Sequence, residues 1–493
     1  MDSASKGHFR LAGQEFPKVT WWKEPEMRKV YFILMFVVLT SATNGYDSSI
    51  VNALLALDEF KEYFNNPTGT IVGLFSSILF LGGVLAQRVV PYLADFFGRR
   101  TAIFSGAVIM ILGVGLQAAS FNLHMFIAGR FLVGFGVAIA HVASPLLIAE
   151  LMHPQHRATF TTIYNTTWYV GSIVAAWLTS GTSQVMNQWS WRAAPPMLQL
   201  WFVWFVPESP RWHISKGNQE AALRILAKVH ANGNADDELV QVEFEEIKST
   251  LKLESECNSS GGWAELWRTK GNRRRLLILA TLGLFSQWSG NGLVSSVLAS
   301  VGITDSNQQL VINGVLQIAN ACVAVGSCFV VDRVGRRKLF LGSTAGMLVC
   351  FVVWTMIFLF YFCYTTAWSG LMVGYAVEIL PFNIRAKGIA VLLFCIDASL
   401  FVSTFANPIA LDVLHWKYHI VYCVWLAIEL AVVYRFYVET RNTPLEEISK
   451  YFDDEDAVVS RAVTTEKDRT LAQDTGRGVE KSESTVVVVQ KEV

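Results

Sequence analysis

The sequence of 493 residues is 52% hydrophobic and only 16% charged, against roughly 25% charged residues in an average soluble domain. Its 40 basic and 40 acidic residues cancel, so charge gives no indication of a nucleic acid partner. A mean hydropathy of +0.37 leaves too little polar surface to cover separate soluble cores, and this favours a membrane protein with several spans. The seven cysteines form no CxxC pair, and we expect no disulfide, no metal and no other cofactor.

The apolar runs, taken in chain order, predict a multi-span protein. Crossing roughly 30 Å of hydrocarbon takes about 20 helical residues. Runs of this kind begin near residues 30, 71, 101, 123 and 160 and, after a short run at 193–206, near 276, 311, 339, 356, 389 and 420. We therefore predict an all-α membrane protein with twelve transmembrane helices in two halves of six. The expected boundaries are 1–29 for an N-terminal segment without a cleavable signal, 30–206 for the first half, 207–275 for a central loop with short helices, 276–440 for the second half, and 441–493 for a largely disordered tail.

Lys and Arg gather in alternate loops, whereas the opposite loops carry far fewer basic residues. Because loops with an excess of Lys and Arg stay in the cytoplasm, we expect both termini to be cytoplasmic. The predicted location is the plasma membrane, with lipid around a monomer.

Three charged signatures occur in the same order in both parts of the sequence. DFFGRR at 95–100 recurs as DRVGRR at 332–337, and PES at 207–209 recurs as VET at 438–440. An acid seven residues before an arginine also occurs twice, as Glu150 with Arg157 and as Glu378 with Arg385. Repeated in register, these residues predict a latch in which acids and arginines pair between neighbouring helices at the cytoplasmic mouths of the spans. The predicted latch residues are Asp95, Arg99, Arg100, Glu150, Arg157, Glu208, Arg211, Asp332, Arg336, Arg337, Glu378, Arg385 and Glu439.

These signatures, with Arg130 in GRFLVGFG, PESPRW at 207–212 and VETRN at 438–442, together resemble the sugar porter family of the major facilitator superfamily. The segments GLFSQWSGNGLVS at 283–295 and VEILPFNIRAKG at 377–388 resemble its fungal branch, which includes lactose-permease-type and hexose transporters. The resemblance implies the major facilitator fold, with two six-helix halves around a central sugar site. It also implies a carrier and not an enzyme.

Two ionisable residues within apolar runs are the sharpest functional candidates, because charged groups are costly in hydrocarbon. Asp47 follows Asn44, Gly45 and Tyr46 in the first run, and Arg130 lies seven residues into the fourth. In proton-coupled sugar porters an Asp and an Arg at these positions form a pair that protonation breaks. The resemblance therefore implies that Asp47 accepts the proton and that Arg130 adjusts its affinity. The alternative is a permanent buried ion pair.

A sugar offers many hydroxyl groups and one apolar ring face, so its site needs amide and aromatic side chains from several helices. The resemblance implies that the sugar-binding residues are Gln287, Trp288, Asn291, Asn320, Asn165 and Asp397. Each polar one has an alternative role, a hydrogen bond to a neighbouring helix. We interpret His141 as a helix-to-helix donor and Glu429 as a packing residue that pairs with Arg435.

Three predicted spans, the sixth, ninth and tenth, are shorter than the family resemblance leads us to expect. The run at 193–206 has too few residues for a full span, and no polar turn separates the ninth and tenth spans within 339–377. We expect the chain to reverse at Thr355 and Met356 or near Thr365 and Thr366, and we expect low surface expression as a result.

The sequence leaves two classes of function open. The first is an alternating-access sugar carrier, a proton symporter for a hexose or a disaccharide such as lactose, with an uncoupled facilitator as its variant. The second is a non-transporting sugar receptor or a transport-defective relative with incomplete spans. Sugar and protons are the expected small-molecule partners.

Overall fold

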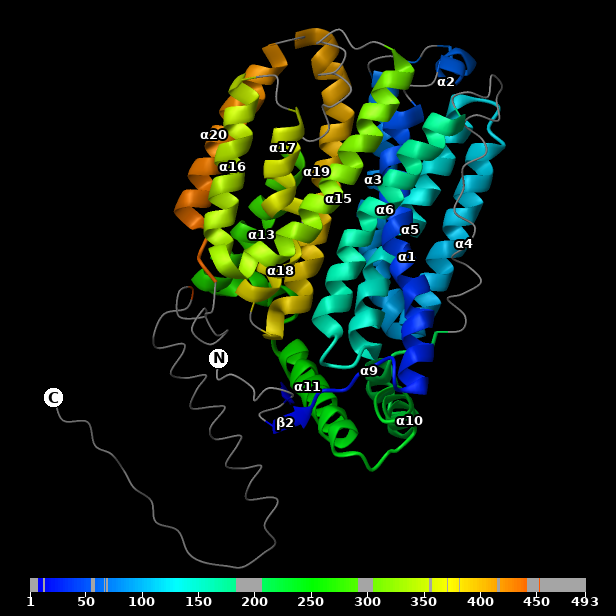
Figure 1. The fold of residues 1–493 in the computed structure, drawn as a ribbon, viewed down its shortest axis with the longest axis vertical. Helices are drawn as coiled ribbons and strands as arrows, with labels where there is room; N and C mark the ends of the chain where they lie inside the picture. Colours follow the sequence, from blue (N-terminus) through cyan, green and yellow to red (C-terminus); the bar gives the residue numbers. More distant parts are fainter. Residues whose placement is uncertain are drawn as a thin grey trace, which may run out of the picture.

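The computed structural model describes residues 8–11, 14–54, 58–65, 67, 70–182, 206–290, 305–353, 357–369, 371–380, 382–414, 417–440 and 452. The described chain is helical except for a small antiparallel hairpin, β1 (His8–Leu11) and β2 (Gln14–Pro17), which the sequence analysis did not predict. The long helices form two bundles that stand side by side (Figure 1).

The first bundle contains α1 (Pro25–Leu54), α3 (Thr70–Phe97), α4 (Arg99–Ala118), α5 (Leu123–Leu151) and α6 (Arg157–Thr182), with the short α2 (Asp58–Tyr63) after α1. The second bundle contains α13 (Lys270–Trp288), α15 (Ser306–Val334), α16 (Arg336–Val353), α17 (Ile357–Tyr364), the π-helical turn η2 (Thr365–Ser369), α18 (Met372–Ile379), α19 (Phe382–Leu414) and α20 (Tyr418–Phe436). Between the bundles in sequence lie α9 (Pro210–Ser215), α10 (Gln219–His230), α11 (Glu238–Gly261), η1 (Gly262–Ala264) and α12 (Glu265–Arg268).

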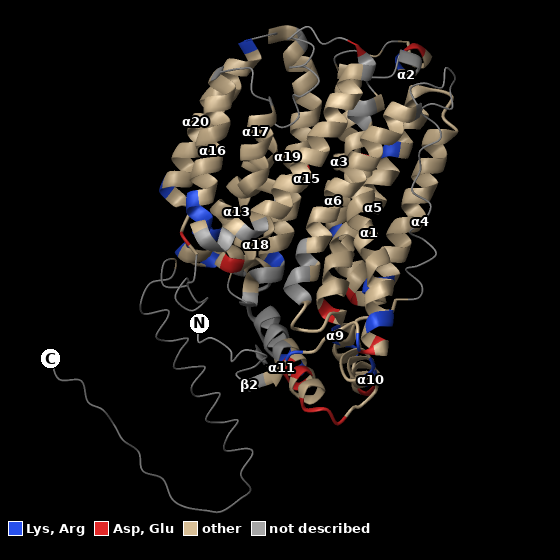
Figure 2. Ribbon diagram, viewed as in Figure 1, with Lys and Arg blue, Asp and Glu red and all other residues tan. Residues whose placement is uncertain are grey.

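The two ends of the molecule differ. The short helices α9, α10 and α11 lie beyond one end of the bundles, which we call the α9–α12 end, and α2 lies at the opposite end, which we call the α2 end (Figure 1). Figure 2 shows Lys, Arg, Asp and Glu concentrated toward the α9–α12 end, whereas the middle of the bundles carries few of them.

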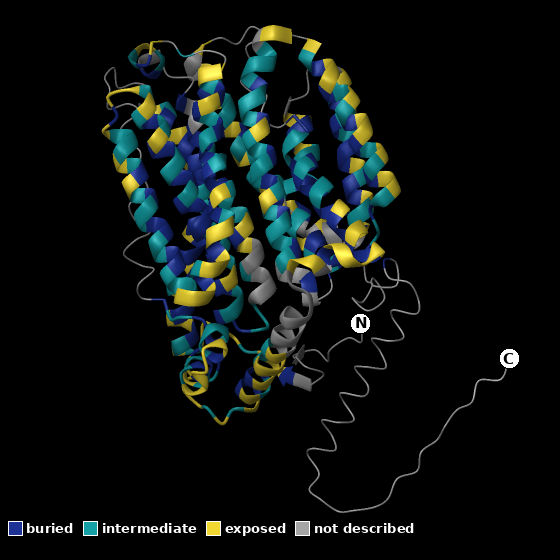
Figure 3. Cartoon of the chain, turned by 180° about the vertical axis from the view of Figure 1, so that it is seen from behind, coloured by how far each residue is buried: buried dark blue, intermediate teal, exposed yellow. Residues whose placement is uncertain are grey.

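Seven described helices are long and apolar enough to cross a membrane: Pro25–Ile50, Thr70–Phe97, Arg99–Ala118, Leu123–Leu151, Gln308–Ser327, Lys387–Leu411 and Tyr418–Phe436. Large apolar side chains such as Phe32, Leu112 and Val424 are exposed on the outer faces of these helices. Exposed residues recur along the outside of both bundles in Figure 3. Such a surface fits lipid and not water, so the fold is that of a multi-span membrane protein.

The predicted starts of eleven apolar runs lie within seven residues of the start of a helix. The twelfth, the short run at 193–206, lies almost wholly outside the described residues, and the domain boundaries stay predictions.

The ninth and tenth spans are joined by the very short connection that the sequence predicted. Helix α16 ends at Val353 and α17 begins at Ile357, and the two pack antiparallel, with the ring centroids of Phe351 and Phe360 5.1 Å apart. Further along, Ser343 Oγ donates to the backbone oxygen of Cys363 at 2.6 Å. The chain then continues through η2 and α18, so the tenth span is a helix broken at a π-helical turn. Turns of this type occur often at functional sites.

Glycine allows close helix contacts within the first bundle. A Cβ at Gly171 in α6 would overlap the backbone oxygen of Ala42 in α1, and one at Gly106 in α4 would lie 2.7 Å from the backbone oxygen of Gly136 in α5. Close approach through small residues is how membrane helices gain packing energy without a hydrophobic driving force. The first bundle is thereby a tightly packed unit.

Candidate functional site

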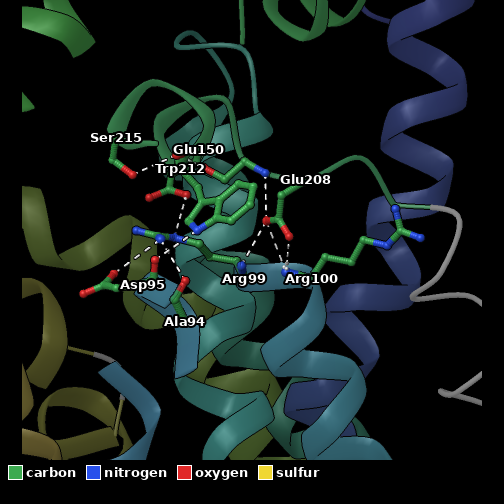
Figure 4. A network of polar contacts seen from close by, with 9 residues as sticks. Ala94, Asp95, Arg99, Arg100, Glu150, Glu208, Trp212 and Ser215 are labelled. Atoms are coloured by element: carbon green, nitrogen blue, oxygen red, sulfur yellow. Dashed lines mark hydrogen bonds and ion pairs between the residues drawn. The ribbon is translucent and has the colours of Figure 1, made fainter. Parts of the chain in front are cut away.

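A network of charged residues lies at the α9–α12 end of the first bundle (Figure 4). The carboxylate of Glu208 accepts hydrogen bonds from the backbone N–H groups of Arg99 at 2.9 Å and Arg100 at 3.1 Å. These are the first residues of α4, where N–H groups lack partners and the helix dipole favours an anion. The Arg99 side chain then reaches Glu150 Oε2 at 3.3 Å and Asp95 Oδ1 at 3.4 Å.

The second bundle contains the same arrangement. Glu439 Oε1 accepts from the backbone N–H of Arg336, the first residue of α16, at 2.8 Å. The Arg336 guanidinium forms a two-pronged contact with Glu378, with Nη2 to Oε1 at 2.9 Å and Nε to both oxygens at 3.2 Å. Thr440 Oγ1 also donates to Glu378 Oε2, at 2.5 Å. The repeated signatures therefore form equivalent networks, which we call the first and second latch.

Each latch lies within one bundle. The first latch joins α3, α4, α5 and the start of α9, and the second joins α16, α18 and the segment after α20. Arg337 Nη2 donates to the backbone oxygen of Tyr434 at 2.6 Å, and Arg211 lies in α9 beside the network. The side chains of the predicted members Arg157, Asp332 and Arg385 lie outside the described residues.

Two contacts of this region were missed by sequence reasoning. Trp212 Nε1 donates to the backbone oxygen of Asp95 at 3.1 Å and holds α9 against α3. The hydroxyl of Tyr375 donates to the backbone oxygen of Val438 at 3.0 Å and accepts from its N–H at 2.9 Å. The place of Trp212 in the PESPRW motif could have indicated its contact, whereas no feature of the sequence connects Tyr375 with Val438.

Asp47 and Arg130 are both buried, at 6% and 2% exposure, and the structure brings them together. Arg130 Nη2 donates to the backbone oxygen of Asp47 at 3.4 Å, and the two side-chain charges interact electrostatically. The Asp47 atom Oδ2 has no hydrogen-bond partner among the described residues. Both residues lie in the third of their helix nearest the α2 end. The hydrogen bond from Arg130 therefore goes to the Asp47 backbone, whereas the carboxylate and the guanidinium interact through their charges.

Of the predicted sugar-binding residues, Asp397 takes part in a contact between the two bundles, whereas Gln287 and Trp288 form hydrogen bonds within the second bundle. Gln87 Nε2 in α3 donates to Asp397 Oδ2 in α19 at 3.1 Å, which joins the two bundles near the middle of both helices. On the second bundle, Trp288 Nε1 donates to the backbone oxygen of Ser399 at 3.0 Å, and Gln287 Nε2 donates to the hydroxyl of the adjacent Ser286 at 3.2 Å.

A second polar contact between the bundles involves η2. The hydroxyl groups of Tyr169 in α6 and Ser369 in η2 lie 2.5 Å apart, and Thr365 Oγ1 donates to Asn320 Oδ1 at 3.5 Å. Asn165 is an exposed residue of α6, and Asn291 lies outside the described residues. The structure thus groups Asn320 and Asp397 with the seam but does not bring Asn165 into contact with them.

Sequence reasoning missed Gln87, Tyr169 and Ser369 as seam residues. Gln87 was a polar residue within an apolar run, and TTAWS at 365–369 interrupts another, so both carried a weak signal. Hydrogen-bond donors and acceptors on both bundles match the chemistry of a sugar, because each sugar hydroxyl group can donate and accept a hydrogen bond.

Two helical bundles with repeated latches and a polar seam define the class of membrane carriers built from two related halves. Residues 33–452 match the family described as Sugar (and other) transporter, so the chain belongs to this sugar porter family of the major facilitator superfamily. Its members are carriers and not enzymes.

Several known proteins are similar to this chain. An MFS-type transporter of Aspergillus cristatus is 27% identical over 84% of this chain and 91% of its own length. A hexose transporter of Saccharomyces cerevisiae is 27% identical over 82% of this chain and 79% of its own length. Among solved structures, the inward open xylose transporter of E. coli matches with a TM-score of 0.71 at 20% identity, over 86% of this chain and all of that one. The proton:xylose symporter bound to 6-bromo-6-deoxy-D-glucose matches with a TM-score of 0.70 at 20% identity, over 87% of this chain and all of that one. These two likenesses show that the chain has the major facilitator fold.

Proposed function

We propose that the chain imports a sugar together with protons across a fungal plasma membrane by alternating access. The observation that carries the proposal is Asp47, a buried carboxyl beside Arg130 whose Oδ2 lacks a hydrogen-bond partner among the described residues. A proton bound there removes a charge from the membrane interior and weakens the attraction to Arg130, which provides a coupling between proton and conformation.

The proposed substrate is a hexose or a disaccharide such as lactose. The polar seam supports a sugar, since donors and acceptors from both bundles lie near the middle of their helices, on Gln87, Tyr169, Asn320 and Asp397. The curated relatives include hexose transporters, and a solved relative is a proton:xylose symporter, which supports the same class of substrate.

The proposed orientation places the α9–α12 end in the cytoplasm, since basic side chains concentrate there (Figure 2). Contacts between the bundles are found from the α2 end to the middle, as between Trp177 and Gly314 and between Gln87 and Asp397. This distribution supports an inward-facing state in which the outer side of the seam is closed.

The experiment is uptake of a panel of radiolabelled sugars by the purified protein in liposomes with an imposed pH gradient. Asp47→Asn removes the titratable group and keeps its shape, so concentrative uptake should be lost while sugar exchange continues. Asp305→Asn, at an exposed position before α15, is the matched control and should behave as wild type. Accumulation by the Asp47 variant would refute coupling through Asp47. If the wild-type protein exchanges sugar without accumulating it, the protein is a facilitator. If it binds sugar without exchanging it, the protein is a receptor.

A further inference from the structure

A second carboxyl group is buried in the membrane-spanning part of the second bundle. Glu429 in α20 is fully buried, at 0% exposure, and lies one turn from Trp425 and one turn from Val433. Both neighbours pack in the apolar cluster around Phe285 and Leu426. A charged carboxylate in such surroundings is costly unless a cation or several hydrogen bonds compensate for it.

No cation contacts Glu429 in the part of the chain that the structure describes. The sequence suggested Arg435 as its partner, but six residues correspond to about 240° around the helix, so the two side chains point to different sides. Instead, the Ser289 hydroxyl lies 3.1 Å from Oε2 and 3.3 Å from Oε1 of Glu429. The pairing with Arg435 was therefore wrong.

The other titratable groups on the surrounding helices are few. Residues 276–289, which include most of α13 and its cap, contain no titratable group. Beyond its basic first turn, α16 contains Cys350, and the membrane-embedded part of α19 contains Cys395 and Asp397. On and after α20 the groups are Tyr418, His419, Tyr422, Cys423, Tyr434, Arg435, Tyr437 and Glu439. Of these, Tyr437 is electrostatically coupled to Glu429. None supplies a positive charge at the carboxyl.

The Ser289 hydroxyl has two possible acceptors, the backbone oxygen of Phe285 and the carboxyl group of Glu429. A serine hydroxyl has one hydrogen to give. The Ser289 hydroxyl lies 2.5 Å from the backbone oxygen of Phe285, the acceptor one turn back in α13, which is closer than either Glu429 oxygen. The same hydrogen can instead point to Glu429, but the hydroxyl has only one, so it cannot satisfy both Phe285 and an ionised Glu429. While it is donated to Phe285, Ser289 Oγ acts as an acceptor, and its 3.1 Å contact with Glu429 is then favourable when the carboxyl carries a proton and donates it.

We propose that Glu429 is a second proton-binding site of this carrier, separate from Asp47 and located where α13 ends. Ser289 follows the last residue of α13 and precedes Gly290, whose φ is 94°. When Glu429 loses its proton, the carboxylate can only accept, and it competes with Phe285 for the Ser289 hydrogen. Proton release thereby loosens the last turn of α13, which carries the candidate sugar-binding residues Gln287 and Trp288. The link to transport rests on the proposed function, but proton binding itself does not.

The direct test is infrared spectroscopy of the full-length protein in liposomes, titrated with pH. A protonated carboxyl gives a C=O stretching band apart from that of carboxylates. In an Asp47→Asn background, which removes the other proposed proton-binding carboxyl, the protein should show such a band at neutral pH. Adding Glu429→Gln should remove it, since the amide keeps the hydrogen bond to Ser289 without a titratable proton. Ser289→Ala should shift the band because it removes the acceptor. Ser327→Ala is the matched control, a buried serine bonded to the backbone oxygen of Val323 at 2.8 Å, and should leave the band in place.

The functional test is the pH dependence of sugar exchange without a gradient. Glu429→Gln should flatten that dependence, because one of the titrating groups is gone, while Asp47→Asn tests the coupling site independently. A band that survives Glu429→Gln together with an unchanged pH profile would overturn the proposal. If Glu429→Gln fails to fold, an unshifted band in Ser289→Ala would overturn it instead. Failure of the Asp47 experiment would refute proton-coupled import but leave the Glu429 band as predicted.

Discussion

Glu208 and Glu439 each lie over the first N–H groups of a helix, and the residue before each helix is a glycine. Gly98 has a φ of 98° and Gly335 a φ of 101°, a region in which residues with a Cβ are strained. A Cβ at Gly98 would also collide with the Glu208 carboxylate, and one at Gly335 would lie 2.7 Å from Glu439 Oε2. Glycine is thus needed for both the backbone conformation and the approach of the carboxylate.

Gly98→Ala and Gly335→Ala should each destabilise the protein by about 1 to 3 kcal/mol, the cost of a strained backbone with a displaced carboxylate. Gly217→Ala is the matched control, since Gly217 has a φ of 81° but open space around its Cβ position. The Gly217→Ala variant has the strained backbone without a displaced carboxylate. Its melting temperature in detergent should therefore fall less than those of Gly98→Ala and Gly335→Ala. Equal losses for all three variants would show that the carboxylate contact contributes nothing.

Sequence reasoning located the buried acids and the Arg130 neighbour of Asp47, but not the group that Glu429 contacts. Asp47 was identified because a charge within an apolar run is expensive, and Glu429 was noticed for the same reason. The Ser289 contact could not be found, because it joins helices 140 residues apart whose packing no local pattern encodes. Contacts within one helix are readable from spacing, whereas contacts between helices depend on how the whole bundle packs.

At the scale of elements, apolar length predicted helix starts, and the repeated signatures pointed to charged residues that the structure brings into contact in both bundles. Their role as a latch in transport stays a prediction. The short connection between α16 and α17 was also predicted, because no polar turn separates the two runs. The π-helical turn η2 was not predicted, since its residues 365–369 differ little from an ordinary helix in composition. Whether the short connection lowers surface expression stays a prediction.

The second latch should contribute more stability than the first. Arg336 meets Glu378 through two nitrogens and Thr440 adds a third donor, whereas Arg99 reaches Glu150 with a single contact at 3.3 Å. Hydrogen bonds to charged groups contribute about 1.5 to 3 kcal/mol. The side chain of Glu378 is 28% exposed against 12% for Glu150, so solvent screening reduces the difference, but the larger number of donors should still make Glu378→Gln lower the melting temperature more than Glu150→Gln. It should also slow transport more than it weakens sugar binding. Equal effects of the two variants on melting would contradict this ranking.

The loop between α5 and α6 should make stability depend on pH. Burial lowers the pKa of His156 below its ordinary value of 6.5, and its Nδ1 lies 3.0 Å from the hydroxyl of Tyr31. The unfolded chain therefore binds this proton at a higher pH than the folded one, and stability must fall as the pH drops below about 6.5. Melting curves across this range should show a shallower pH dependence for His156→Gln, whereas His124→Gln, at an exposed position, should retain the wild-type dependence.

At the scale of the whole molecule, the sequence predicts two halves because its signatures repeat, but it does not predict how they meet. Near the α2 end, Leu310 of α15 packs into an apolar cluster of the first bundle with Tyr46 and Phe75. Near the middle, Gln87 contacts Asp397. An alternating-access carrier must open such contacts in every cycle, so they have to be individually weak and reversible.

Fixing the two bundles together near the α2 end should therefore stop transport. A Cβ at Gly314 in α15 would lie 3.1 Å from the ring of Trp177 in α6, so cysteines at these positions can be joined by a short bifunctional thiol reagent. In a chain whose seven native cysteines are replaced, the linked Trp177→Cys and Gly314→Cys protein should lose nearly all sugar exchange and regain it when the link is cleaved. The matched control links Ser49→Cys to Ser172→Cys, whose native hydroxyl groups lie 2.5 Å apart and join α1 to α6 within the first bundle, and it should exchange sugar as before. Full exchange by the first linked protein would mean that the bundles do not separate at the α2 end during transport.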